Sequence, residues 1–165
     1  MDGLRFVPLG ERPDLIRTTV GWHLAEFDLG GDAAFWLAAR SEEAQPGGIP
    51  SAWIAFVDEL PVGSVSLTVR NMDTHPELTP WLAALYVHAS FRGQGIGTAL
   101  VRRCEDEARS VGADRIYLYT ERARARELYR RLGWAVRSSE LYEGELVWVM
   151  ERDLGGEPPS VNAVG

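Results

Sequence analysis

A glycine-rich turn of a kind that binds anions occupies residues 90–98, with the sequence SFRGQGIGT. An apolar run precedes this turn and a segment with helical spacing follows it, so the turn joins a strand to a helix. Backbone N–H groups converge on an oxyanion only where no Cβ obstructs them, and a helix N-terminus adds partial positive charge. We therefore predict an anion site, suited to a pyrophosphate, on the backbone from Arg92 to Thr98.

The dinucleotide-binding fingerprint G-x-G-x-x-G/A does not fit this turn. Its sixth position is Thr98 when counted from Gly93 and Leu100 when counted from Gly95. The acidic residue expected about 20 residues later is also misplaced, because Asp114 precedes the next predicted strand instead of ending it. A Rossmann nucleotide site is therefore not expected.

Arginine is concentrated around the turn. All 17 basic residues are arginines, and ten of them lie within residues 92–131 beside only six acids. The whole chain has a net charge of −7, so the remainder is strongly acidic. A basic segment in an acidic protein favours one compact polyanionic ligand over nucleic acid, although a solvated helix face is an equal alternative.

The residue inventory excludes several functions. Without lysine the chain cannot form a Walker-type phosphate loop, a pyridoxal Schiff base or a kinase active site. A single cysteine, Cys104, cannot form an internal disulfide, and three histidines leave little material for a zinc site, so we predict no metal. No signal peptide and no membrane-spanning apolar run is recognisable, so we predict a cytoplasmic protein without a membrane partner.

Alternating and helical patterns outline the elements that position the turn. They predict strands at 4–8, 52–57, 63–70, 81–88, 115–120, 134–137 and 146–151, and helices at 15–27, 32–39, 96–111 and 122–132. The 165 residues, 45% of them hydrophobic, suffice for one core and are too few for two ordinary domains. We predict one domain at residues 1–154 and a flexible tail at residues 155–165.

Three segments of the chain match the sequence motifs of a known protein family, and they occur in the same order as in that family. They are the central-strand residues Leu85-Tyr86-Val87, the turn residues Arg92-Gly93-Gln94-Gly95-Ile96-Gly97, and the later pattern Ala125-x-x-Leu128-Tyr129-x-x-x-Gly133-Trp134. Together they cover roughly the second half of the chain and resemble the GNAT superfamily of acyl-CoA-dependent N-acyltransferases. The resemblance implies an α/β (α+β) GNAT fold, with a mixed, mostly antiparallel sheet of about six to seven strands and helices on both faces.

The resemblance also implies acetyl-CoA as co-substrate. The turn amides would hold the CoA pyrophosphate, and the edge of the central strand would face the pantetheine amides. One of the arginines 122, 124 and 126 can meet a CoA phosphate, and Arg126 is the candidate retained. The implied cofactor-binding residues are Leu85, Tyr86, Val87, Arg92, Gly93, Gln94, Gly95, Ile96, Gly97, Thr98 and Arg126.

By the same resemblance, Tyr129 matches the tyrosine that faces the thioester sulfur. A phenol with a pKa of about 10 can protonate or hydrogen-bond the thiolate that leaves when an amine attacks. The alternative is an ordinary core tyrosine beside Leu128 and Leu132. Cys104 lies in the apolar stripe of the preceding helix, so we predict a buried small hydrophobe and not an acyl-carrying nucleophile.

The chain departs from the family pattern at two positions. Arg122 stands where an asparagine is common, and Trp81 where some members carry a glutamate base. A base is still required, because an alkylammonium is not a nucleophile until it loses a proton. Glu77 is the first choice, and a solvated loop acid is its alternative role. Other candidates are a water chain, Asp73, Glu26, Asp28 and His88, the last favoured for a structural role beside the cofactor.

The acceptor site in this family lies mainly on the first two helices and the loop before the central strand. Here those segments carry acidic residues among aromatic ones, and together these would attract a cationic amine. The alternative is that the aromatic residues belong to the core and the acids are exposed on the surface. The residues are Trp22, His23, Glu26, Phe27, Asp28, Asp32, Phe35, Trp36, Asp73, His75 and Glu77.

We therefore predict an N-acetyltransferase that moves an acetyl group from acetyl-CoA to a primary amine of a small molecule or peptide by direct attack in a ternary complex. The alternative is a non-catalytic CoA-binding sensor or scaffold. A homodimer is possible, since dimers are common in the superfamily and aromatic residues recur in the last strands, at Trp134, Tyr142 and Trp148.

Overall fold

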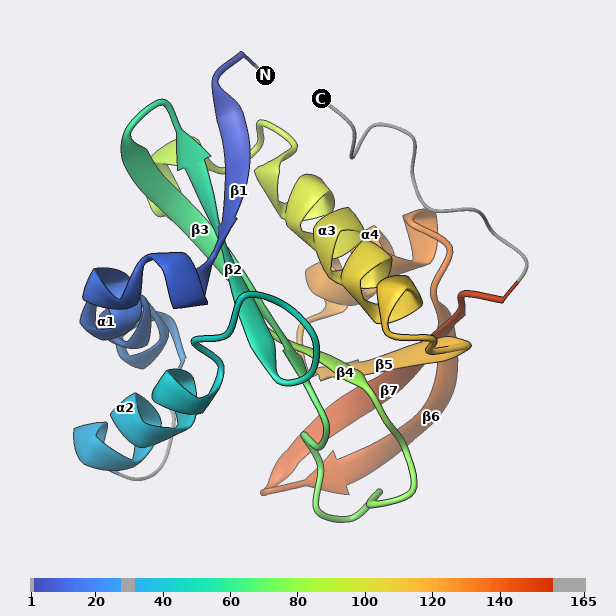
Figure 1. The fold of residues 1–165 in the computed structure, drawn as a ribbon. Coiled ribbons are helices and arrows are strands. Elements are labelled where there is room, and N and C mark those ends of the chain that lie inside the picture. Colours follow the sequence, from blue (N-terminus) through green and yellow to red (C-terminus); the bar gives the residue numbers. More distant parts are fainter. Residues whose placement is uncertain (1, 28–31, 156–165) are drawn as a thin grey trace.

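One mixed sheet organises the protein, whose computed structural model describes residues 2–27 and 32–155. The sheet has seven strands in the order β1-β2-β3-β4-β5-β7-β6 (Figure 1). They are β1 Leu4–Pro8, β2 Ser51–Val57, β3 Leu60–Thr68, β4 Trp81–Val87, β5 Arg115–Thr120, β6 Ala135–Tyr142 and β7 Glu145–Asp153. Only β4 and β5 pair in parallel in this sheet, so the predicted mixed, mostly antiparallel sheet is confirmed.

Helices cover both faces of the sheet, as expected. They are α1 Ile16–Glu26, α2 Ala33–Glu42, α3 Ile96–Ser110 and α4 Ala123–Arg131. The pair α1 and α2 lies on one side and the pair α3 and α4 on the other (Figure 1). Within the described residues, no helix has the length and apolar character needed to cross a bilayer.

The largest core cluster joins α3 and α4 to the sheet. Val65 and Leu67 of β3 and Met150 of β7 pack there with Leu100 and Cys104 of α3, and all five are fully buried. Burial raises the pKa of the Cys104 thiol well above its ordinary value, which confirms the predicted buried hydrophobe. On the opposite face, β2 packs against the turns that precede α1.

Several predicted boundaries were wrong by a few residues. The hairpin connection at residues 58–62 is only Asp58-Glu59, because Val57 already pairs with Leu60. Helix α2 continues to Glu42, three residues beyond its predicted end at residue 39, and Leu15 belongs to a 3-10 turn instead of α1. Strands β6 and β7 are longer than predicted, because ladder hydrogen bonds extend them through exposed polar positions that carry no hydrophobic pattern.

Candidate active site

The two parallel strands of the sheet, β4 and β5, stop pairing toward their carboxyl ends, and this unpaired stretch is called the opening below. Trp81 of β4 pairs with Tyr117 of β5, and no later pair between these strands follows in the described residues. Beyond this point β4 presents peptide groups toward β5 without a strand partner. Ligands of open sheets bind at the carboxyl ends of parallel strands, where the strand order changes. This opening is the natural place for a cofactor arm.

A bulge in β4 reshapes the edge of the opening. Ser64 pairs with Tyr86 and Ser66 with Ala83, so two β4 residues, Ala84 and Leu85, oppose the single residue between the serines. Ala84 has φ of +58°, a left-handed conformation that costs a non-glycine residue about 1–2 kcal/mol. Such strain recurs at functional sites, and the bulge turns the peptide groups of the strand edge.

The glycine-rich turn has a backbone conformation that suits an anion. Gly93 and Gly95 have φ of +78° and +85°, and no atom lies within 4 Å of the position that a Cβ would occupy on either. Gly95 caps α3, whose first internal bond runs from Ala99 N–H to its carbonyl. Among the described residues, no hydrogen-bond acceptor is found for the amides of residues 93–98. The turn therefore offers several unpaired donors at a helix N-terminus, which suits an oxyanion.

Tyr129 lies on the α4 side of β4. It is only 6% exposed and belongs to the same core cluster as Leu85 and Val87, whereas Tyr86 faces α1 and stacks on Trp22 at 5.1 Å between ring centroids. Burial raises the pKa of the Tyr129 hydroxyl, which is therefore protonated at physiological pH. The hydroxyl forms no hydrogen bond with a described residue. It is an available proton donor in the core cluster that also holds Leu85 and Val87 of β4.

Glu26, a candidate base, is held by two arginines. Its carboxylate oxygens lie 3.2 Å from Arg92 Nη2 and 3.1 Å from Arg122 Nη1. Arg122, followed by Arg92, lowers the pKa of Glu26. The guanidinium of Arg122 also lies 4.6 Å from the Phe27 ring centroid. The unusual Arg122 is thus bound to α1, and Glu26 is a paired anion poorly suited to accept a proton.

The other base candidates interact with neighbouring residues of their own. Glu77 is exposed at the amino end of β4, where its Oε1 lies 3.3 Å from His75 Nδ1, and Asp73 lies against Tyr142. His88 accepts a hydrogen bond of 3.2 Å from the Ser90 amide, the structural role favoured for it. Asp28 lies outside the described residues. The role of Glu77 as base stays a prediction.

Trp81 explains why no carboxylate stands at the start of β4. Its side chain is fully buried, and its Nε1 donates 2.7 Å to the Leu78 carbonyl. It fills a second core cluster with Tyr117 and Val149. An acid would be buried without a partner in this apolar cluster.

The acceptor residues predicted on the first two helices divide into two groups. Trp22, His23 and Phe27 gather on the α1 side of β4, where His23 stacks on Phe27 at 5.7 Å. Phe35 and Trp36 instead pair with each other on α2, whose N-cap is Asp32. Burial, followed by the charge of Arg40, lowers the pKa of His23 to about 3, so its imidazole is neutral at physiological pH.

A buried polar group beside His23 was missed by the sequence analysis. Arg40 of α2 donates 2.9 Å to the Ser66 hydroxyl, which donates 2.7 Å to Glu43. The sequence did contain a sign of this group, because Ser64 and Ser66 alternate with apolar residues in β3 and so make one face of that strand polar. Arg126 lies 4.4 Å from the Trp148 ring centroid, and its contact with a phosphate stays a prediction.

Comparison with known proteins gives a consistent result. The model of the Acetyltransferase (GNAT) family matches residues 17–134. Ard1 from Thermoplasma volcanium shares the fold with a TM-score of 0.72 at 15% identity, over 92% of this chain and 97% of that chain. Arabidopsis thaliana Naa50, in complex with the bisubstrate analogue CoA-Ac-MVNAL, gives 0.68 at 15% identity, over 92% and 99%.

A third structure, yncA from Salmonella typhimurium with acetyl-CoA, gives a TM-score of 0.64 at 20% identity over 97% of this chain and 99% of that chain. No curated protein sequence gives a significant match. At these identities the solved structures establish the fold alone.

Proposed function

Because the chain belongs to the GNAT acetyltransferase family, and is therefore an acyltransferase, we propose that it moves an acetyl group from acetyl-CoA to a primary amine. The amine belongs to a small molecule or a peptide and attacks directly in a ternary complex. The observation that carries this proposal is the combination of unpaired turn amides after β4 with the buried phenol of Tyr129, which belongs to the same core cluster as Leu85 and Val87 of that strand.

The donor is held along β4 and the turn after it. The amides of residues 93–98 donate hydrogen bonds to the pyrophosphate, and the open space at Gly93 and Gly95 lets the phosphate oxygens approach the backbone. The peptide groups of Leu85, Tyr86 and Val87 bind the pantetheine amides. Ile96 contributes its backbone only, since its side chain is 1% exposed in the core. Arg126 is retained as a phosphate contact.

The chemical step needs one proton donor and one proton acceptor. The amine nitrogen forms a bond to the acetyl carbon, the carbon–sulfur bond breaks, and CoA leaves as a thiol. Tyr129, which its raised pKa keeps protonated before the reaction, donates its hydroxyl proton to the departing sulfur and regains a proton from solvent before the next turnover. The ammonium proton passes to water or through a water chain to Glu77.

A second function, a CoA-binding sensor without catalysis, is favoured by a different observation. Arg122 and Trp81 replace two residues that the family often uses, and Arg122 is bound to Glu26 instead of facing the opening freely. The presence of Tyr129 favours the catalytic function over the sensor. A homodimer stays part of the proposal, but Trp134 is 3% exposed and serves the core, so it gives no support to an interface.

Thiol release on mixing the protein with acetyl-CoA and an amine tests the proposal. The panel holds small primary amines and peptides with free N-termini, and calorimetry first measures CoA binding. Tyr129→Phe is expected to bind CoA normally and to lose about 10²-fold or more in kcat, the range for one general acid. Tyr117→Phe, a buried tyrosine of the other sheet face, is the control and should keep its rate. CoA binding without turnover across the panel favours the sensor, and absent CoA binding refutes both.

A further inference from the structure

The helix that carries Tyr129 ends in a turn built around Gly133. Trp134 N–H donates to the Tyr129 carbonyl at 3.0 Å and Gly133 N–H to the Arg130 carbonyl at 3.1 Å, the two bonds of a Schellman motif. Gly133 has φ of +99°, as this motif requires. The ring centroids of Tyr129 and Trp134 lie 5.8 Å apart, which is the apolar contact that accompanies the motif. The position of the phenol is therefore coupled to that of Trp134.

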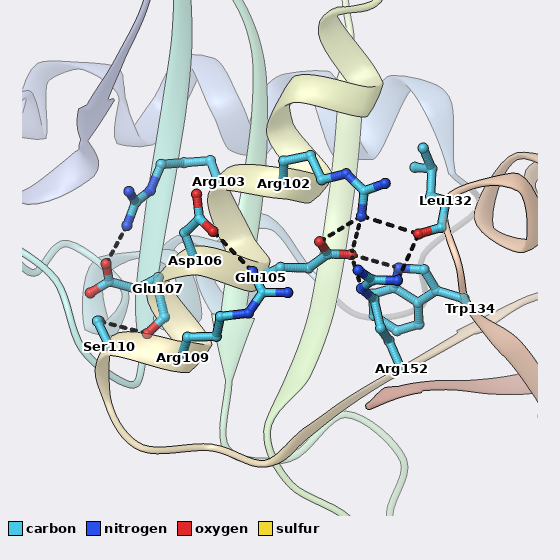
Figure 2. Close-up of polar contacts among 10 residues, drawn as sticks. All are labelled: Arg102, Arg103, Glu105, Asp106, Glu107, Arg109, Ser110, Leu132, Trp134 and Arg152. Carbon is cyan, nitrogen blue, oxygen red and sulfur yellow. Dashed lines mark hydrogen bonds and ion pairs between the residues drawn. The ribbon is translucent and has the colours of Figure 1, made fainter. Parts of the chain in front are cut away.

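Trp134 is bound by a buried carboxylate of α3. Glu105 is fully buried and accepts a hydrogen bond of 2.9 Å from Trp134 Nε1 (Figure 2). Two arginines neutralise this carboxylate: Arg102 Nη1 lies 2.8 Å from Oε2 and Arg152 Nε lies 3.2 Å from Oε1. The same arginines donate to the Leu132 carbonyl at 3.1 and 2.9 Å, and so pair a carbonyl that the end of α4 would leave free.

The helix that carries Glu105 begins at the glycine-rich turn. Gly95 caps α3, and Glu105 lies nine residues after Ile96, about 14 Å along the axis at about 1.5 Å per residue. One rigid element thus presents the amide donors at its start and the Glu105 carboxylate further along. The distance between those donors and the Tyr129 phenol is therefore set through Glu105.

We propose that Glu105 is a positioning residue for the transfer reaction. It holds the end of α4 against α3, so that the phenol of Tyr129 stands at the thioester sulfur while the turn holds the pyrophosphate. This inference rests on the proposed function, in which Tyr129 protonates the sulfur. Proton transfer depends on short-range geometry, so a small displacement of the phenol impairs the chemical step and leaves the anion site intact.

Three variants separate positioning from general support of the fold. Glu105→Gln keeps an acceptor for the indole N–H and removes the charge between the two arginines. Trp134→Phe removes the indole N–H and keeps the carboxylate with both arginines. Glu107→Gln is the matched control, because this carboxylate lies on the same helix but binds Arg103 (Figure 2) and the Gly48 amide, at 2.8 Å, instead of α4.

The kinetic expectation is a change in kcat alone. Glu105→Gln and Trp134→Phe should lower kcat about 10-fold or more, within the range that a misplacement of about 1 Å produces. The KM for acetyl-CoA and the Kd for CoA should stay within about two-fold, and Glu107→Gln should match the unmodified protein. In a Tyr129→Phe background, Glu105→Gln should cause no further fall, because residues that act through one another are non-additive.

An independent readout uses the tyrosine itself. The protein is labelled with 3-fluorotyrosine, and the ¹⁹F resonance of Tyr129 is assigned by its loss in Tyr129→Phe. This resonance should shift or broaden in Glu105→Gln and in Trp134→Phe, and should stay in place in Glu107→Gln.

An unchanged resonance, or additive losses of kcat, would overturn the positioning role. If Tyr129→Phe keeps full turnover, the proposed role of Tyr129 fails, while the ¹⁹F result still decides whether Glu105 positions the ring. If Glu105→Gln does not fold, Trp134→Phe carries both tests.

Discussion

Glu26 and Arg122, 96 positions apart, form an ion pair that joins the end of α1 to the residue before α4, with 3.1 Å between carboxylate and guanidinium. The other carboxylate oxygen lies 3.2 Å from Arg92, the first residue of the anion-binding turn. One anion of α1 therefore neutralises cations at the carboxyl ends of both parallel strands. A CoA phosphate that reaches these arginines meets this carboxylate as a competitor.

Glu26→Gln should tighten CoA binding and weaken amine binding. Loss of the negative charge frees both arginines to bind the CoA phosphates. We expect the Kd for CoA to fall roughly three-fold, as is typical of a pair of partly exposed charges, and this decrease should be smaller at high salt. The KM for the amine should rise, because α1 loses its link to both loops. Calorimetry and steady-state kinetics measure the two effects. Glu59→Gln, an exposed acid paired with Arg5, is the control. Weaker CoA binding in Glu26→Gln would refute the competition.

Gly95→Ala should weaken CoA binding without unfolding the protein. No atom obstructs a Cβ there, but φ of +85° costs an alanine about 1–2 kcal/mol. Because of this cost the turn should adopt a different backbone conformation, in which its amides no longer point at the pyrophosphate. We expect a rise of about 10-fold or more in the Kd for CoA. Gly21→Ala in α1, where a Cβ also has open space, should instead raise Tm, because alanine favours a helix by about 1 kcal/mol. Normal CoA affinity in Gly95→Ala would exclude this backbone as the pyrophosphate site.

His75 should make stability depend on pH. Its Nε2 lies 2.7 Å from Glu140 and its Nδ1 3.3 Å from Glu77, and Glu140 is the main cause of its raised pKa. A raised folded pKa means that the stabilisation is complete below the ordinary value of 6.5 and is lost as pH rises through the folded pKa. The Tm difference between the unmodified protein and His75→Gln should therefore be larger at pH 5.5 than at pH 9. A difference that grows with pH would contradict this ion pair.

Cys104 should be unreactive in the folded protein. Its thiol is fully buried, its Sγ lies 3.6 Å from the Ser66 carbonyl, and burial raises its pKa. A thiol reagent such as DTNB should modify it only after denaturation, since the thiolate is the reactive form. Acetyl transfer should survive long incubation with iodoacetamide. Inactivation that tracks modification of Cys104 would point to a covalent acyl-enzyme instead of direct attack.

The elements that could be predicted from sequence are those whose burial leaves a regular pattern. Helix α3 has one apolar and one charged face and is followed by Gly112, two residues after its end at Ser110. The strands β2 and β4 are nearly continuous apolar runs, so both kinds of element were found. The turn at residues 92–98 was predictable for a different reason, because glycine is the residue that φ of +78° and +85° strongly favours.

The relationships that fix the candidate site were not predictable. The link of Glu26 to Arg122 spans 96 residues, and nothing local distinguishes either side chain from a solvated surface charge. The carboxylate of Glu105 is charged yet fully buried, which depends on arginines from two elements that only the fold brings together. The bulge at Ala84 also leaves no sequence mark, because alanine is not a residue that favours positive φ.

Within the described residues, β4 and β5 share a single register pair, Trp81 with Tyr117, and this line of weak pairing forms a seam in the sheet. Up to residue 87 the chain builds β1 to β4, and from residue 115 it builds β5 to β7, so each side is an antiparallel sheet made from one continuous stretch of sequence. Separating the two sides breaks fewer ladder bonds than opening either of them. The seam is therefore the line along which the sheet separates with the least loss of backbone pairing.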